Sequence, residues 1–212
     1  ISGDEAMRES FLSGTDFHTA TAARVFHVAE DEVTPELRRR AKAVNFGVVY
    51  GISAFSLSQD IGVSVAEARG DMERYFETYS TLRQYMTDVV VQAEQDGYVQ
   101  TMLHRRRALP ELKSSNHNLR EFGKRVALNM PVQGTAADII KIAMARVSRR
   151  LEEEGFAAHM ILQVHDELDF ECPVDEVERL TAMVRDVMEH VVDLRVPLIA
   201  EASTGVTWAD AK

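Results

Sequence analysis

One helix-forming stretch, Thr34 to Gly51, constrains the fold of this chain more than any other segment. Thr34 suits the N-cap of a helix, Pro35 suits its first position, and Gly51 suits its C-terminal end. Within the stretch, basic and aromatic side chains recur every four residues: Arg38, Lys42, Phe46 and Tyr50. Because each step of four turns by only about 40° around a helix, these side chains form one slanting stripe.

The stripe is basic in its first half and aromatic in its second half. Cationic side chains and the unpaired N–H groups at a helix start bind phosphate, whereas flat aromatic faces bind a base or a sugar. A basic turn followed by aromatic residues also occurs where a solvated helix face runs into a core contact, so the pattern alone leaves both interpretations open. Its functional interpretation is a nucleotide-binding helix.

A second motif places carboxylates at a tight turn. Residues 160–164 and 168–172 are typical of two strands, and His165, Asp166 and Glu167 lie between them. Adjacent carboxylates repel each other unless a cation holds them, and oxygen ligands suit Mg²⁺. Acidic turns are common, so this motif alone does not decide between a metal site and a solvated turn.

Together the two motifs resemble a known family. The run RRRAKAVNFGVVYG resembles motif B of family A DNA polymerases, the DNA polymerase I group, and QVHDEL resembles motif C of the same family, in the same order along the chain. The resemblance covers essentially the whole chain. It implies an α+β fold, with a helical fingers subdomain over residues 1–118 and the C-terminal part of a palm subdomain with an antiparallel sheet over residues 119–212.

The resemblance implies a dNTP-binding role for five residues: His18, Arg38, Lys42, Phe46 and Tyr50. The first three would neutralise the triphosphate, and Lys42 would also protonate the leaving pyrophosphate. Phe46 would pack on the sugar and base, and a Phe at this position goes with discrimination against dideoxynucleotides in the family. Tyr50 would shape the nascent base pair. From its position alone, in the first turn of a helix predicted over 16–28, His18 is more simply a surface or capping residue.

A polar stripe follows later in the chain, on helices predicted over 116–130 and 131–154. Its members are again spaced by four: Arg125, Asn129 and Gln133. Amides can reach base edges in the minor groove and an arginine can hold a phosphate, although amides also satisfy helix junctions. The resemblance of RVALNMPVQGTAADIIK to the family's duplex-contacting segment implies primer–template binding by these residues, together with His165.

The resemblance implies template-directed nucleotidyl transfer to a primer 3′-hydroxyl, in DNA replication and repair, with two Mg²⁺ ions in the complete site. Asp166 would be the metal ligand, with Glu167 a supporting carboxylate, and Lys42 completes the catalytic set. The family's motif A, which carries the other metal-binding Asp, is absent, and neither Asp4 nor Asp16 sits in such a motif. We therefore predict a DNA-directed DNA polymerase as the parent protein and an inactive isolated chain.

The remaining elements follow from local patterns. Helices are expected over 2–12, 55–61, 64–96 and 175–192, a hairpin over 98–109 and a final strand over 198–208. The hairpin contains an arginine run, and the family pattern GYVxTxxGRRRxxP has glycine where this chain has His104. This departure puts the local turn geometry in question.

Charge is distributed unevenly although the net charge is −10. Residues 1–150 carry 20 basic and 19 acidic side chains, whereas residues 151–212 carry 4 and 15. Phosphate binding depends on local basic clusters, so the total does not exclude nucleic acid. The single Cys172 excludes an internal disulfide, and no apolar run approaches the roughly 20 residues of a membrane span. We expect a cytoplasmic protein of the bacterial nucleoid.

The expected partners are a DNA primer–template, dNTPs and the missing N-terminal part of the same polymerase, with no membrane. Self-association is expected if the palm sheet is left uncovered. A non-catalytic nucleotide- or DNA-binding fragment is the alternative. A metal-dependent hydrolase using His165, Asp166 and Glu167 is a further alternative, and it would need additional ligands such as His159 or His190.

Overall fold

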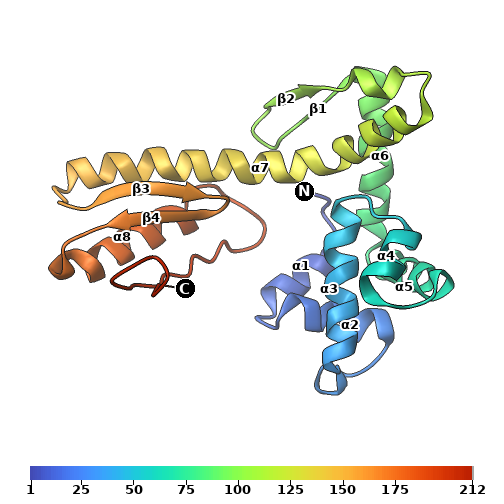
Figure 1. The fold of residues 1–212 in the computed structure, drawn as a ribbon, viewed down its shortest axis with the longest axis horizontal. Coiled ribbons are helices and arrows are strands. Elements are labelled where there is room, and N and C mark those ends of the chain that lie inside the picture. The colour runs from blue at the N-terminus through green and yellow to red at the C-terminus, as the bar shows by residue number, and fades with distance from the viewer. Residues whose placement is uncertain (212) are drawn as a thin grey trace. The chain divides into compact units, whose positions relative to one another are not determined.

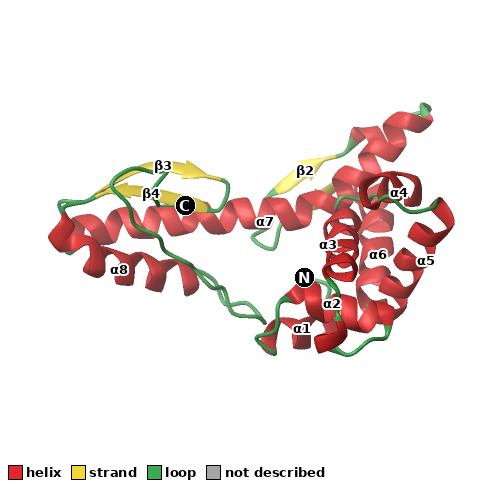
Figure 2. Ribbon diagram, turned by 60° about the horizontal axis from the view of Figure 1, so that its bottom comes forward, coloured by secondary structure: helices red, strands yellow, loops and turns green. Residues whose placement is uncertain are grey.

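The computed structural model describes residues 1–211 and has an α+β fold. The chain divides into two compact units, residues 1–134 and 135 onward (Figures 1 and 2). The two units divide within one continuous helix, and the expected fingers–palm boundary near residue 118 stays a prediction. The described residues contain no helix that is both long and apolar enough to cross a membrane.

The first unit is built mainly of helices. Its first six helices are α1 (Glu5–Leu12), α2 (Phe17–Phe26), α3 (Pro35–Val49), α4 (Ala54–Ile61), α5 (Val65–Thr78) and α6 (Ser80–Asp96), with a 3₁₀ turn η1 (Glu30–Glu32). Their main core is closed by apolar and aromatic side chains: Val25, Val44, Val48, Leu57, Ile61, Ala68, Tyr75 and Tyr79. This core fixes α3 against α2, and so sets which face of α3 meets solvent.

Helix α3 begins and ends close to where the sequence predicts. The Thr34 hydroxyl accepts a hydrogen bond from the Leu37 N–H at 3.2 Å, and Pro35 occupies the first helical position. After the last helical residue, Gly51 adopts a left-handed conformation with φ of 66°. The helix buries Val44 and Val48, which leaves the side chains of the basic and aromatic stripe on other faces.

The helix expected over 64–96 is instead two helices, α5 and α6, that meet at Tyr79. Tyr79 has non-helical backbone angles (φ −114°, ψ 62°) and is completely buried. Its ring packs on Tyr75 with centroids 4.9 Å apart, and its hydroxyl lies 3.2 Å from that of Thr21. The break follows from long-range packing, which local periodicity does not report.

The expected hairpin is present as β1 (Tyr98–Gln100) paired antiparallel with β2 (Arg106–Ala108), followed by the 3₁₀ turn η2 (Pro110–Lys113). His104, in the connecting loop, adopts a left-handed φ of 63°. Glycine tolerates this conformation most easily, which explains the glycine of the family pattern. The loop therefore reaches a left-handed conformation without glycine.

Two helices were expected over 116–154, but the structure has one, α7 (His117–Glu153), with Pro131 inside it. Proline usually ends or kinks a helix because it lacks an N–H donor. Here the helical conformation continues past Pro131, and α7 contributes to the core of the first unit through Ala127 and to that of the second unit through Val147 and Leu151.

The second unit contains the C-terminal part of α7, the antiparallel strands β3 (His159–Val164) and β4 (Glu167–Glu171), the 3₁₀ turn η3 (Val174–Glu176) and α8 (Val177–Glu189). Its core consists of apolar residues of these elements: Val147, Leu151, Ala158, Leu180, Met183 and Val187. The final strand expected over 198–208 is not formed. Within the described part of the chain that segment has no strand partner, and Ile199 and Val206 are 79% and 98% exposed.

Candidate functional site

Arg38, the first residue of the α3 stripe, is held by a carboxylate of the neighbouring helix. Its guanidinium donates two hydrogen bonds to Asp16, from Nε and from one terminal nitrogen, each at 3.0 Å. Asp16 also caps α2 by accepting a hydrogen bond from the Thr19 N–H at 2.9 Å. The hydrogen bond from Arg38, aided by those from Thr19 and opposed by desolvation, lowers the pKa of Asp16 to about 2.

His18, on the first turn of α2, faces the middle of α3. The Asn45 amide nitrogen lies 3.1 Å from His18 Nδ1. Because an amide nitrogen only donates, Nδ1 is the acceptor and the neutral ring carries its proton on Nε2. Burial is the main cause that lowers the His18 pKa, and Arg38 and Lys42 add to it while Asp16 opposes it. The imidazole is therefore neutral at pH 7.

The aromatic half of the stripe begins beside this histidine. The Phe46 ring lies 5.6 Å from the His18 ring between centroids, and the Lys42 ammonium lies 6.0 Å from the Phe46 centroid. Phe46 remains 53% exposed, which is unusual for so large an apolar side chain in a packed helix. Helices α2 and α3 thus bring together cationic, imidazole and aromatic groups at one surface.

The other two arginines of the run RRRAK have structural partners. Arg39 pairs with Glu36 on its own helix at 2.7 Å and also donates to the Ile61 carbonyl oxygen at 2.9 Å. Arg40 pairs with Asp71 of α5, whose side chain is completely buried and also pairs with Arg74. Arg39 and Arg40 thus connect α3 to other parts of the first unit, whereas Arg38 belongs to the stripe by its spacing.

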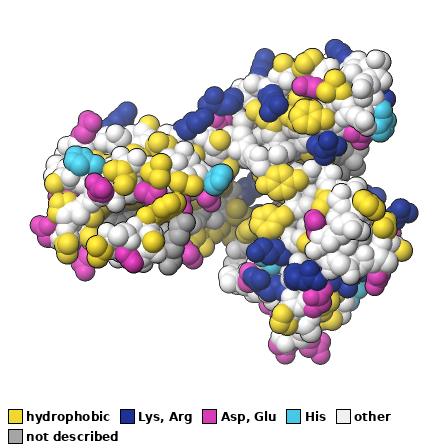
Figure 3. Space-filling model, viewed as in Figure 1, with side chains coloured by type: hydrophobic (Ala, Val, Ile, Leu, Met, Phe, Trp, Pro, Cys, Tyr) yellow, Lys and Arg dark blue, Asp and Glu magenta, His cyan; other side chains and the backbone are white. Residues whose placement is uncertain are grey.

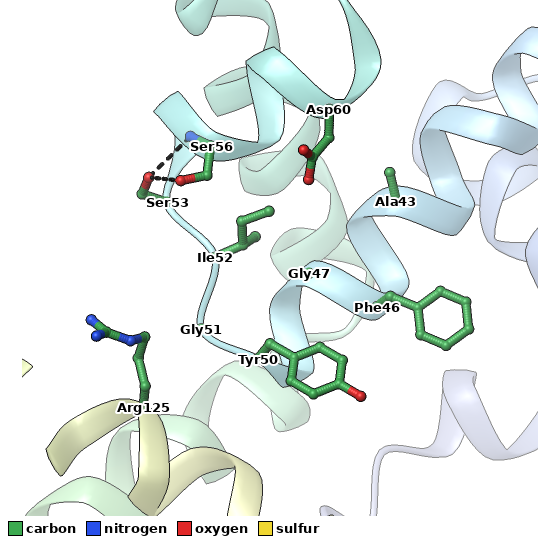
Figure 4. Close-up of a pocket in the computed structure, with 10 residues that line it drawn as sticks. All are labelled: Ala43, Phe46, Gly47, Tyr50, Gly51, Ile52, Ser53, Ser56, Asp60 and Arg125. Carbon is green, nitrogen blue, oxygen red and sulfur yellow. Dashed lines mark hydrogen bonds between the residues drawn. The ribbon is translucent and has the colours of Figure 1, made fainter. Parts of the chain in front are cut away.

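A cleft of about 480 Å³ opens at the C-terminal end of α3 (Figure 4). It is lined from α3, the following loop, α4 and α7: Ala43, Phe46, Gly47, Tyr50, Gly51, Ile52, Ser53, Ser56, Asp60 and Arg125. Gly47 is required where the chain turns back: a Cβ there would lie 2.5 Å from a methyl carbon of Ile52. The cleft combines an aromatic wall with hydroxyl, carboxylate and guanidinium groups.

The polar stripe of α7 meets the aromatic stripe of α3 within the first unit. Gln133 Nε2 donates a hydrogen bond to the Tyr50 hydroxyl at 2.9 Å, and Arg125 lines the same cleft as Tyr50. Asn129, between them in the stripe, has a buried Oδ1 with no hydrogen-bond partner among the described residues. The structure thus places two of these three side chains beside Tyr50.

In the second unit, the acidic motif forms the tip of the β3–β4 hairpin as expected. Val164 pairs with Glu167, so His165 and Asp166 make the two-residue turn. His165 has a left-handed φ of 53°, and Gln163 Nε2 donates to its carbonyl oxygen at 2.5 Å. The Glu167 side chain accepts a hydrogen bond from Trp208 Nε1 at 3.1 Å. Asp166 and Glu167 are thus adjacent and exposed.

These carboxylates supply oxygen donors of the kind that Mg²⁺ prefers. However, the described residues contain no group of three or more His, Cys, Asp or Glu side chains able to hold a metal ion. His159 pairs with Glu171 at the other end of the hairpin, and His190 contacts Asp186 at the end of α8. Among the described residues, Asp166 and Glu167 therefore form only a partial donor set, and His159 and His190 do not join them.

Three residues around these sites were missed by the sequence analysis in their present roles. Asp16 was mentioned only as lying outside any motif A-like segment, Asn45 was hidden among apolar neighbours, and Trp208 was assigned to a strand. Each contact joins residues distant in sequence, so local spacing gave no signal. The charge asymmetry is visible on the surface: on the face shown, Lys and Arg side chains are more frequent over the first unit than over the second (Figure 3).

Comparison with known proteins gives consistent matches. The family "DNA polymerase family A" matches residues 1–210. DNA polymerase I of Bacillus caldotenax is 52% identical to this chain over 212 residues, and DNA polymerase I of Bacillus subtilis (strain 168) is 51% identical. Each alignment covers 100% of this chain and 24% of the relative. The chain therefore spans about a quarter of the length of these curated relatives.

A solved structure has the same fold. The POL domain of Pol1 from M. smegmatis, in complex with DNA primer-template and dNTP, matches with a TM-score of 0.95 and 47% sequence identity. The match covers 100% of this chain and 37% of that chain.

Proposed function

This chain belongs to DNA polymerase family A, and from that premise we propose that the protein carrying it is a DNA-directed DNA polymerase that adds dNTPs to a primer 3′-hydroxyl. The observation that carries the proposal is the grouping of His18, Arg38, Lys42 and Phe46 on one surface of α2 and α3. The related M. smegmatis domain, which is complexed with primer-template and dNTP, supports the same substrates.

In this proposal, the basic half of the stripe binds the triphosphate. Arg38 offers a planar guanidinium suited to bidentate phosphate contact, and Lys42 adds a mobile ammonium one turn further along the helix. His18 contributes an Nε2–H donor without adding charge, because its Nδ1 accepts from Asn45. Lys42 also donates the proton that the departing pyrophosphate takes up.

The aromatic half of the stripe binds the nucleoside. Phe46, exposed at the centre of the surface, packs on the sugar and base and discriminates against dideoxynucleotides. Tyr50, tethered by Gln133, shapes the nascent pair. Arg125, Asn129, Gln133 and His165 bind the primer–template, Arg125 by a phosphate contact and the amides by contacts to base edges.

Asp166 is the proposed metal ligand and Glu167 the supporting carboxylate. In a complete site two Mg²⁺ ions, when bound, would activate the primer hydroxyl and stabilise the leaving group. Because the donor set in this chain is partial, we propose that the isolated chain does not catalyse extension. The remaining part of the same polymerase is then an obligatory partner, and the proposed substrate places the protein in the bacterial cytoplasm.

The first test is primer extension with Mg²⁺ and all four deoxynucleotides. The 212-residue chain is expected to give no product, whereas a complete DNA polymerase I carrying this sequence is expected to extend the primer and to lose that activity with Asp166→Ala. Extension by the isolated chain that Asp166→Ala abolishes would contradict its inactivity. Full extension by the complete enzyme with Asp166→Ala would contradict the assigned mechanism.

The second candidate is a fragment that binds nucleotide or DNA without catalysis. The partial donor set favours it for the isolated chain. Triphosphate or DNA binding that weakens with salt and is lost in the double variant Arg38→Ala, Lys42→Ala would support it.

Self-association is also proposed, because Ile161 and Leu162 of β3 are 56% and 48% exposed. A monomeric mass by light scattering would argue against self-association.

A further inference from the structure

A short C-terminal turn contacts the acidic hairpin tip. Trp208, the only tryptophan of the chain, donates a hydrogen bond from indole Nε1 to Glu167 Oε1 at 3.1 Å. Trp208 is 50% exposed and does not belong to the core of the second unit. An indole nitrogen can only donate, and an ionised carboxylate only accepts, so this bond has one polarity and depends on the carboxylate.

The turn that carries Trp208 is built by its own contacts. Thr207 donates to Asp210 Oδ2 from its hydroxyl at 2.6 Å and from its backbone N–H at 3.1 Å. In return, the Asp210 N–H donates to the Thr207 carbonyl oxygen at 3.0 Å. A Cβ added to Gly205 would lie 2.7 Å from the Asp210 Cβ and 2.8 Å from the Ala211 nitrogen. The packing of the turn therefore leaves no space for a side chain at Gly205.

The other partner is also fixed by the backbone. Glu167 is the first residue of β4 and pairs with Val164 across the turn, and the Gln163 side chain holds the carbonyl oxygen of His165. The Glu167 side chain remains free to rotate about its own bonds unless something binds its carboxylate. The Trp208 bond occupies one carboxylate oxygen and leaves the other available.

We propose that Trp208 is a positioning residue that orients the Glu167 carboxylate beside Asp166 for the polymerase reaction. The inference rests on the proposed function, because Glu167 has a role only in that reaction. Gly205 and Asp210 shape the C-terminal turn, and the turn fixes the position of the indole. The hydrogen bond from the indole then fixes the position of the Glu167 carboxylate. A hydrogen bond to a charged group at this site limits the rotamers that Glu167 samples.

The contact itself is tested in the 212-residue chain, where all tryptophan fluorescence comes from Trp208. Glu167→Ala is expected to shift the emission and to increase quenching by acrylamide, because the indole loses its hydrogen bond to Glu167. Glu171→Ala is the matched control at the other end of β4, and it is expected to leave the emission unchanged. Identical emission and quenching in wild type and Glu167→Ala would overturn the contact.

The functional role is tested in a complete DNA polymerase I that carries this sequence. Trp208→Phe keeps an aromatic ring but removes the donor, so kcat is expected to fall about tenfold with the KM for dNTP unchanged, as for loss of a hydrogen bond to a charged group. Gly205→Ala, which displaces the turn without altering Trp208, is expected to give the same change. Circular dichroism of each variant confirms that it is folded.

A double mutant separates positioning from general stabilisation. If Trp208 acts through Glu167, then Trp208→Phe has little further effect once Glu167→Ala is present. The inference would be overturned if the kcat losses of the two single variants multiply in the double variant, or if Trp208→Phe keeps the wild-type kcat. Either result would leave the proposed polymerase function intact. Absence of primer extension by the unmodified complete enzyme would instead overturn the proposed function itself.

Discussion

The cationic surface of the first unit and the carboxylate tip of the second unit satisfy their charges in opposite ways. In the first unit the arginines of α3 already have anionic partners: Arg38 has Asp16, Arg39 has Glu36 and Arg40 has Asp71. In the second unit no ion pair joins Asp166 or Glu167 to a cation among the described residues, and the Glu167 carboxylate accepts a hydrogen bond from a neutral indole. The charges of the α3 arginines are neutralised within the first unit, whereas the carboxylate charges at the hairpin tip are not neutralised by a described residue.

This difference has a consequence for ligand binding. A phosphate that binds Arg38 competes with the Asp16 carboxylate, so the cost of separating an existing pair reduces the affinity gained. A cation that binds Asp166 has no ion pair to separate among the described residues, and it relieves the repulsion between neighbouring carboxylates. The following predictions compare the two sites, from the largest expected effect to the smallest.

The largest effect is expected at the unbalanced site. In a complete polymerase, Asp166→Ala should lower kcat on the order of 10³-fold, as expected when a charged group that stabilises the transition state is removed. Glu171→Gln, on the same hairpin but away from its tip, is the control and should have nearly wild-type activity in single-turnover primer extension. A small loss with Asp166→Ala would show that the tip carboxylates do not carry the chemistry.

The next effect concerns stability in the first unit. Asp71→Ala should lower the free energy of unfolding by about 3 kcal/mol, because it leaves the partly buried Arg40 and its neighbour Arg74 without their completely buried partner. Glu36→Ala removes an exposed partner of Arg39 and should cost much less, because solvent screens that ion pair. Urea denaturation of the 212-residue chain measures both, and equal losses would contradict the distinction between them.

A smaller effect is expected on triphosphate binding. Arg38→Ala should weaken dNTP binding about tenfold, since one charge-assisted phosphate contact is lost and the Asp16 carboxylate is left without its cationic partner. Arg39→Ala is the neighbouring control and should leave the affinity within about twofold, because its partners are Glu36 and Ile61. Equilibrium dialysis distinguishes them, and equal losses would argue for a diffuse basic surface.

The smallest effect is a pH dependence of stability. The pKa of Asp16 is lowered to about 2 in the folded protein, so its contribution is present above the ordinary aspartate range and is lost as the pH falls toward 2. Because the pair is nearly half exposed, screening limits the contribution to about 0.5 kcal/mol. Asp16→Asn keeps a good N-cap, so its stability difference from wild type should narrow on acidification, and a constant difference would contradict this account.

The sequence predicted the site best where local rules apply. Thr34, Pro35 and Gly51 bracket α3 as expected, the four-residue spacing separates Arg38 from its two neighbours, and the acidic hairpin forms at 159–171. The fold class and the family were also predicted correctly. The roles of the individual site residues in catalysis and DNA binding remain predictions.

The failures all involve distant partners. The helix break at Tyr79 depends on burial against Thr21 and Tyr75, and neither is visible in the periodicity of the segment. Pro131 suggested a boundary, yet residues on both sides of it contribute to packed cores and the helix continues. The expected last strand has an adequate pattern but no neighbouring strand in the described chain, and a strand requires a partner for its backbone groups.

All three non-glycine residues with positive φ in the described chain are histidines: His27, His104 and His165. A left-handed conformation costs an ordinary side chain roughly 1 kcal/mol, which glycine avoids. At position 165 a glycine would therefore remove this backbone cost from the hairpin tip. If stability alone were selected, glycine would be favoured over histidine at this position. Directed evolution for thermal tolerance, without a requirement for activity, would be drawn first to such positions.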